Sequence, residues 1–258
     1  MKVTRTAACL LTAALALPMW PTTPAPAAQT VKLEASLTPE RLGAGTTLYF
    51  GFQIAGPHGE VPPPLSTVNL LYPANLGLIT SGLGLSTCSR TELEAQSACP
   101  PNSLMGYGTA LAEVPFGPDT IRETAQITTW MAPIEQGHLG LLFLAQGQTP
   151  VRAELIFTSH ILAANRPFGG AVATTLPLIP SLPEAPNVSV TRLNTTLGPM
   201  HITYYQRFHG KTTAYHPTGI RLPHTCPHGG FPFAAELTFQ NGTQTTAHTT
   251  VPCPPPRH

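Results

Sequence analysis

The chain has 258 residues, of which only 10% are charged while 42% are hydrophobic. Its 13 lysines and arginines nearly balance 12 aspartates and glutamates, so it has no basic field to hold phosphates, which argues against nucleic-acid binding. Thirty prolines and 22 glycines, together with many threonines, argue against helix bundles and favour short strands joined by tight turns. The hydrophobic residues recur in alternating runs, which favours a folded body over disorder.

The N-terminus has the three parts of a secretory signal peptide. Lys2 and Arg5 precede a short apolar run, Ala7 to Leu17, and small residues follow at Ala25 to Ala28. This order is typical of a signal peptide, and we predict that residues 1–27 are removed by cleavage after Ala27, or one residue later. The apolar run is shorter than the roughly 20 residues that span a bilayer. We therefore expect a secreted, extracellular or cell-surface protein with no transmembrane segment after cleavage.

Residues 28–258 are predicted to form one β domain; a boundary near Pro115, giving two packed β subdomains, is the alternative. Apolar residues alternate with polar ones over 31–37 and 48–54, which is typical of strands with one buried face. Turn-rich clusters separate the further strands, which suits an all-β fold: an antiparallel β-sandwich with one short disulfide-closed helix. The other predicted strands are Thr67–Leu71, Met105–Val114, Ile121–Met131, His138–Ala145, Val151–His160, Gly170–Leu176, Val188–Leu197 and His201–Phe208.

The segment between Cys88 and Cys99 predicts the short helix. Ser89 and Glu92 have the spacing of a capping box, in which each side chain bonds the backbone of the other residue. Pro100 and the proline after it end the segment. An even number of cysteines in an exported chain indicates disulfides, and the short separation favours a Cys88–Cys99 bond.

The last part of the chain predicts a β-hairpin. Apolar and polar residues alternate from Phe233 to Phe239, and Asn241-Gly242 is a strong hairpin signal. A two-residue turn would place Phe239 opposite Gln244, whereas a three-residue loop would place it opposite Thr243. We prefer the second register because it keeps the apolar side chains on one face.

Two cysteines flank this hairpin, Cys226 before it and Cys253 after it. The preferred register brings the chain before the first strand beside the chain after the second. We therefore predict a Cys226–Cys253 disulfide, which would stabilise the fold mainly by restricting the unfolded chain. Neither predicted pair has C-x-x-C spacing, so the cysteines do not indicate a redox or zinc-ribbon site.

Three groups of turn residues and cysteines are distinctive: Cys99-Pro100 followed by Ser103 and Gly106-Tyr107-Gly108-Thr109-Ala110, the segments Pro167-Phe168-Gly169-Gly170 and Pro177 to Pro183, and a terminal CP-GGFPF…NGT…VPCP pattern. Together these motifs resemble exported actinobacterial β-rich proteins of unknown function. The resemblance covers most of the predicted mature chain and rests on turns and cysteines. It implies export and a shared architecture, but no reaction.

Motifs for catalysis are absent from the sequence. There is no G-x-S-x-G nucleophile elbow and no H-E-x-x-H zinc motif, and the single aspartate, Asp119, lies beside Pro118 in a predicted turn. We therefore predict no catalytic, cofactor-binding or metal-binding residue and no enzymatic activity. An extracellular hydrolase with a site of glutamates and histidines is the alternative, because closeness in space cannot be read from one sequence.

A second alternative is a metal-binding module on the segment from His201 to His228, which holds five histidines. The same segment is rich in aromatic residues, and alternation places Tyr205, Arg207 and His209 on one exposed face, with Tyr204 and Phe208 packing inward. Exposed tyrosine and arginine favour recognition surfaces. The leading hypothesis is a structural, adhesive or ligand-binding role at or near the cell surface, without a cofactor, toward a cell-wall glycan or another surface protein.

Overall fold

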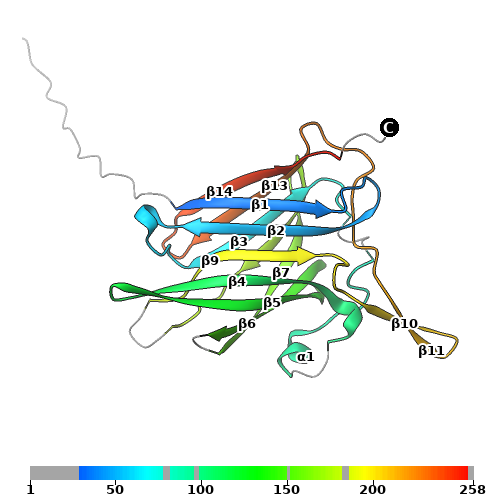
Figure 1. Ribbon diagram of the computed structural model, residues 1–258, viewed down its shortest axis with the longest axis horizontal. Coiled ribbons are helices and arrows are strands. Elements are labelled where there is room, and N and C mark those ends of the chain that lie inside the picture. The colour runs from blue at the N-terminus through cyan, green and yellow to red at the C-terminus, as the bar shows by residue number, and fades with distance from the viewer. Residues whose placement is uncertain (1–28, 78–81, 96–98, 150–151, 182–185, 255–258) are drawn as a thin grey trace, which may run out of the picture.

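The computed structural model describes residues 29–77, 82–95, 99–149, 152–181 and 186–254 (Figure 1). The predicted signal peptide, residues 1–27, lies outside the described residues. The strands are β1 (Thr30–Thr38), β2 (Gly45–Ala55), β3 (Leu65–Pro73), β4 (Leu104–Phe116), β5 (Asp119–Glu135), β6 (His138–Thr149), β7 (Ala153–Ala163), β8 (Phe168–Thr175), β9 (Ser189–Leu197), β10 (Tyr204–Phe208), β11 (Lys211–Tyr215), β12 (Ile220–Arg221), β13 (Phe231–Phe239) and β14 (Gln244–Val251). Between them lie the helix α1 (Arg90–Glu94) and two 3-10 turns, Pro57–Gly59 and Pro101–Ser103.

One antiparallel sheet forms the body of the protein. Its strand order is β1-β2-β9-β4-β5-β6-β7-β8-β3-β13-β14, with the short β12 on β2. The sheet curves until its first and last strands lie side by side (Figure 1), and the Thr243 hydroxyl donates to the Gln29 side-chain oxygen at 3.2 Å across this seam. The result is a nearly closed, barrel-like sheet.

The predicted sandwich therefore needs correction, because the strands belong to one curved sheet and not to two packed layers. Alternation of apolar and polar residues marks a strand with one buried face, and it is the same in a sandwich and in a barrel. Strands β4 to β8 follow one another as hairpins. The pairs β2–β9, β4–β9, β3–β8 and β3–β13 join distant segments and close the curve. Pro115 lies within β4, in the middle of this sheet.

The β13–β14 hairpin has the predicted register. Leu237 pairs with Thr245 and Ala235 with Ala247, and the backbone N–H of Phe239 donates to the carbonyl of Thr243 at 2.9 Å. The three-residue loop thus keeps the apolar residues of β13 on the inner face of the sheet.

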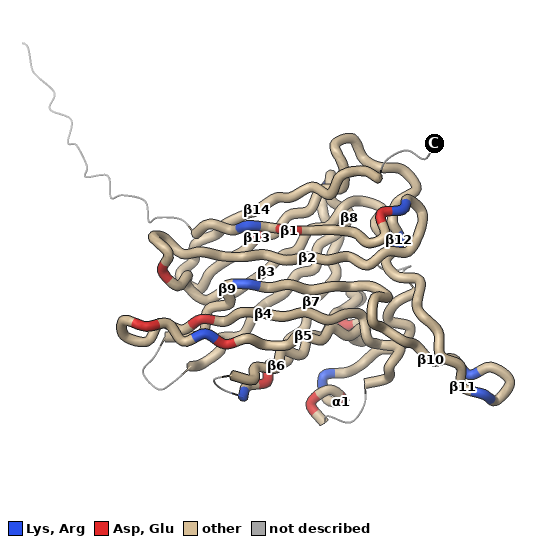
Figure 2. The backbone as a smooth tube through the Cα atoms, in the orientation of Figure 1, with Lys and Arg blue, Asp and Glu red and all other residues tan. Residues whose placement is uncertain are grey.

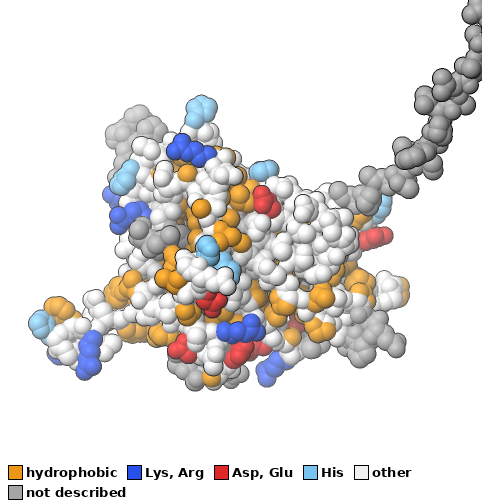
Figure 3. Space-filling model, turned by 180° about the vertical axis from the view of Figure 1, so that it is seen from behind, with side chains coloured by type: hydrophobic (Ala, Val, Ile, Leu, Met, Phe, Trp, Pro, Cys, Tyr) orange, Lys and Arg blue, Asp and Glu red, His pale blue; other side chains and the backbone are white. Residues whose placement is uncertain are grey.

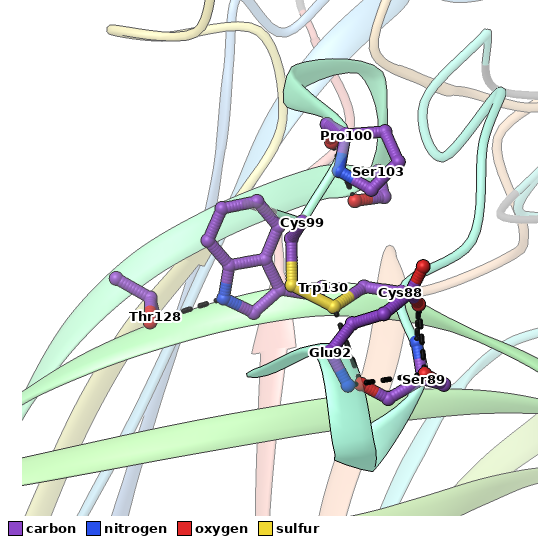
Figure 4. The surroundings of a disulfide bond; sticks show 8 residues. All are labelled: Cys88, Ser89, Glu92, Cys99, Pro100, Ser103, Thr128 and Trp130. Atoms are coloured by element: carbon purple, nitrogen blue, oxygen red, sulfur yellow. Dashed lines mark hydrogen bonds between the residues drawn. A yellow bond between two sulfur atoms is a disulfide. The ribbon is translucent and has the colours of Figure 1, made fainter. Parts of the chain in front are cut away.

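Both predicted disulfides are present. Cys226 and Cys253 have their Cα atoms 5.9 Å apart, and those of Cys88 and Cys99 are 5.1 Å apart. Helix α1, with its capping box, lies inside the second loop (Figure 4). The helix ends at Glu94, earlier than the cysteine spacing suggested, and residues 96–98 lie outside the described part. None of the described helices is long and apolar enough to cross a membrane.

The end of the barrel-like sheet nearest α1 is densely filled. Tyr204, Met105 and Ile202 are fully buried there. The Tyr204 hydroxyl donates to the carbonyl of Leu104 at 2.7 Å and accepts the backbone N–H of Gly84 at 2.8 Å. This pair of hydrogen bonds ties β4 to the loop that crosses this end of the sheet.

The predicted strand over 201–208 starts only at Tyr204 and pairs with β11, a strand that was not predicted from the sequence. The β11 segment, Lys211–Tyr215, is mostly polar and shows no alternation of apolar and polar residues, so its sequence did not predict a strand. Tyr204 is buried as predicted, but Phe208 is 64% exposed because β10 and β11 form a separate two-stranded hairpin that projects from the body (Figure 1).

Candidate functional site

A cavity of about 450 Å3 lies inside the barrel-like sheet. Side chains from strands β2 to β9 and from β13 line it, together with Ile179 and Pro180 of the β8–β9 connection. The strand registers place it in the half of the sheet that ends at the β4–β5 turn, away from α1. The sheet is thus packed solid at one end and hollow at the other.

Small inward residues create this space. On β4 and β5, Ala110 pairs with Ala125, and Ala125 pairs with Gly147 on β6. Three neighbouring strands therefore contribute no large side chain at this level, and a sheet of this many strands encloses more room than small side chains can fill. On the adjacent strands β6 and β7, the rings of Phe143 and Phe157 stack with their centroids 5.1 Å apart and form part of the cavity wall.

Most polar groups in the cavity wall are satisfied by the protein itself. The hydroxyls of Thr174 and Ser159 lie 2.6 Å apart, and Ser181 donates to the carbonyl of Pro186 at 2.6 Å. Thr195 donates to the carbonyl of Tyr107 at 3.5 Å. These residues stabilise the wall and have little capacity left for a ligand.

Glu123 is different. Its side chain lines the cavity, and its buried Oε1 has no hydrogen-bond partner among the described residues. Removal from water raises the pKa of the Glu123 carboxyl above its usual value. Among the described lining residues there is no lysine, arginine or histidine to offset a negative charge.

The inward direction of Glu123 is visible in the sequence, although no catalytic motif includes this residue. In the predicted strand Ile121–Met131, Glu123 lies on the same face as Ile121, Ala125 and Ile127. A carboxyl group on the apolar face of a strand is unusual, since buried charged residues are rare unless paired. Catalytic motifs are defined by several residues at fixed spacing, so a single acidic residue in a strand matches none of them.

A second hollow, of about 360 Å3, lies outside the sheet beside the Cys88–Cys99 bond. Glu92, Trp130 and Glu154 line it, and the Trp130 indole N–H donates to the Thr128 hydroxyl at 3.2 Å (Figure 4). The backbone N–H and hydroxyl of Ser89 donate to Glu92 at 2.7 Å each, and these bonds lower the pKa of the Glu92 carboxyl. Glu92 is thus engaged in the helix cap and poorly suited to act as a general acid.

The predicted binding surface lies on the projecting hairpin. Tyr205 and Arg207 are exposed on β10, and His209 begins the two-residue turn to β11. The side chain of Asn102 holds the base of this hairpin, accepting the N–H of Tyr205 at 2.8 Å and donating to its carbonyl at 2.7 Å. Lysine and arginine lie along the hairpin (Figure 2), and the space-filling view shows basic and histidine side chains there beside hydrophobic ones (Figure 3).

The histidine-rich segment does not assemble a metal site in the part of the chain that the structure describes. No group of three or more His, Cys, Asp or Glu side chains that could hold a metal is found there. Cys226 is bonded to Cys253, and a ring nitrogen of His216 lies 3.0 Å from the carbonyl of Ile202. The described part of the structure therefore does not bring together the histidines that the metal-binding alternative would use.

Comparison with protein-family models, curated proteins and solved structures found no match. Function is therefore inferred from the geometry of the cavity and the surfaces around it.

Proposed function

We propose that this is an exported, disulfide-stabilised binding protein that holds an apolar small molecule inside its barrel-like sheet. One observation carries the proposal, the apolar cavity of about 450 Å3. Ligand sites in proteins are typically concave and mostly apolar, with volumes of about 300–1,000 Å3. The cavity also has the usual composition of such sites, an apolar wall with very few free polar groups.

The size of the cavity suits a single hydrocarbon chain. A water molecule occupies about 30 Å3 of liquid, so the space accommodates on the order of 15 groups of similar size. Transfer of one methylene from water contributes about 0.8 kcal/mol. A chain of about 12 carbons would then contribute roughly 10 kcal/mol, from which the cost of association must be subtracted.

The two disulfides are compatible with an oxidising extracellular environment, where such bonds persist. Apolar molecules dissolve poorly in water, so a protein outside the cytoplasm that shields them is physically reasonable. We include a location at or near the cell surface in the proposal, on the strength of the predicted signal peptide.

The proposal is tested with Nile red, a neutral dye whose fluorescence rises in apolar surroundings. The wild-type protein should bind the dye, and dodecanol should displace it. Ala145→Trp places a large side chain in the cavity, whereas Gln146→Trp places the same side chain on the opposite face of β6. We expect loss of binding only in Ala145→Trp, with both variants still folded by circular dichroism. Equal binding by the two variants would locate the dye elsewhere and refute the proposal.

Recognition of a glycan or a surface protein by the projecting hairpin is the second candidate function. Tyr205 is 47% exposed and Phe208 64%, and Arg207 lies between them in sequence. Large aromatic side chains exposed beside arginine are typical of binding surfaces. A double variant with serine at Tyr205 and Phe208 should lose binding to cell-wall material, while Nile red binding stays unchanged. Unchanged cell-wall binding would exclude the hairpin as the contact surface.

A further inference from the structure

We infer that the ligand is a single-chain amphiphile whose polar end, an alcohol or a primary amine, donates a hydrogen bond to Glu123. This inference rests on the proposed function, because it assumes that the cavity is the binding site. It specifies the chemical class of the ligand and the residue that would select it.

The position of Glu123 is the first part of the argument. It lies on β5 four residues from Asp119, where the strand begins, and pairs with Ala112 of β4. Its neighbours on the inner face of β5, Ile121 and Ala125, are both apolar. The cavity continues from this level past Leu141 and Phe233 toward the filled end. A chain lying along the cavity would therefore have its tail in the apolar part and its polar end beside Glu123.

The hydrogen-bonding state of Glu123 is the second part. A buried polar atom without a partner costs free energy, and most such atoms in folded proteins are paired. Oε1 of Glu123 has no partner among the described residues, whereas the threonine and serine hydroxyls of the wall have theirs. The Glu123 side chain is half-buried and lines the cavity, so a ligand hydroxyl or ammonium group beside it would supply a donor to the carboxyl group.

Charge determines which polar ends are disfavoured. Glu123 is the only carboxyl group among the described lining residues, and no lysine, arginine or histidine accompanies it there. A ligand carboxylate placed beside this half-buried carboxyl group would bring two like charges together in mostly apolar surroundings, which is unfavourable. The cavity should therefore discriminate against fatty acids, although their hydrocarbon chains would fit equally well.

The test compares three ligands with the same chain, dodecanol, dodecylamine and dodecanoic acid, by displacement of Nile red. In the wild-type protein the alcohol and the amine should bind on the order of tenfold or more tightly than the acid, as expected for a hydrogen bond to a charged group. Glu123→Gln keeps a carbonyl acceptor but removes the charge. The variant should bind dodecanol with an affinity within a few-fold of that of the wild type, bind dodecylamine about tenfold more weakly, and bind dodecanoic acid more tightly.

Glu113→Gln is the matched control, because Glu113 lies on the outer face of β4 and pairs with Arg122 at 2.8 Å. It should not change the affinity for any of the three ligands. The relative affinities of dodecanol and dodecylamine for the wild-type protein then show which of the two polar ends the site prefers.

The two proposals fail in different ways. If all three ligands bind the wild type with equal affinity and Glu123→Gln changes none of them, the role of Glu123 is refuted while binding in the cavity stands. If neither Nile red nor any of the three ligands binds, the proposed function itself is refuted.

Discussion

Ala125→Leu gives a quantitative test of where the hydrocarbon chain lies. Ala125 faces the cavity from the middle of β5 and pairs with Ala110 and Gly147, so a leucine side chain can extend into open space there. Leucine adds three carbon atoms to the wall, and the cavity should then hold about three fewer carbons of ligand. At about 0.8 kcal/mol per methylene, the longest chain that fits should lose roughly 2.4 kcal/mol, close to a 60-fold loss of affinity.

The assay is a series of straight-chain alcohols, octanol to tetradecanol, that displace Nile red from the wild type and the variant. Affinity should rise with chain length until the cavity is full, and the variant should reach this limit about three carbons earlier than the wild type. Short alcohols should bind both proteins equally. The variant should be at least as stable to heat as the wild type, because the leucine buries apolar surface in a space that is otherwise unfilled.

Gln126→Leu is the control, since Gln126 is the next residue on the same strand and points to solvent. It adds apolar surface outside the sheet and should leave the chain-length series unchanged. The reasoning is refuted if Ala125→Leu folds normally and gives the same series as the wild type, because the chain would then not pass Ala125.

Three further predictions concern stability. Glu123→Gln should raise the melting temperature near neutral pH but not near pH 4. Desolvation raises the pKa of the Glu123 carboxyl in the folded state, so the folded state holds the proton more tightly and wild-type stability falls as pH rises through that pKa. A difference in melting temperature that does not change with pH would contradict this. Tyr204→Phe should cost about 1–3 kcal/mol in urea unfolding, because a partly buried carbonyl and a partly buried N–H lose their partner. An unchanged midpoint would show that neither bond matters. Replacing Cys226 and Cys253 together by serine should cost roughly 3.5 kcal/mol in guanidinium unfolding, given the sequence separation of 27; stability equal to that of the wild type would exclude the loop-entropy explanation.

Glu123 shows how much of the candidate site could be predicted. The sequence shows that Glu123 lies on the apolar face of a strand, so the inward direction of its side chain was predictable. That the sheet around it encloses a cavity was not predictable, because the enclosure depends on the pairing of strands far apart in the chain, such as β2 with β9 and β3 with β8. Tyr205 and Arg207 were correctly expected to be exposed, whereas the inward prediction for Phe208 was wrong, since the alternation that suggested it belongs to a hairpin outside the main sheet.

Local chemistry alone determined several features of this protein. The capping box of α1, both disulfides and the register of the β13–β14 hairpin involve residues close in sequence, so turn residues, spacing and alternation were sufficient to predict them. The tertiary structure decided that the strands form one curved sheet and not two layers, that one end is filled around Tyr204, and that the other end is hollow around Glu123. These features depend on which distant strands pair and on how closely side chains from all of them fill the enclosed volume, and alternation within a single strand carries no information about either.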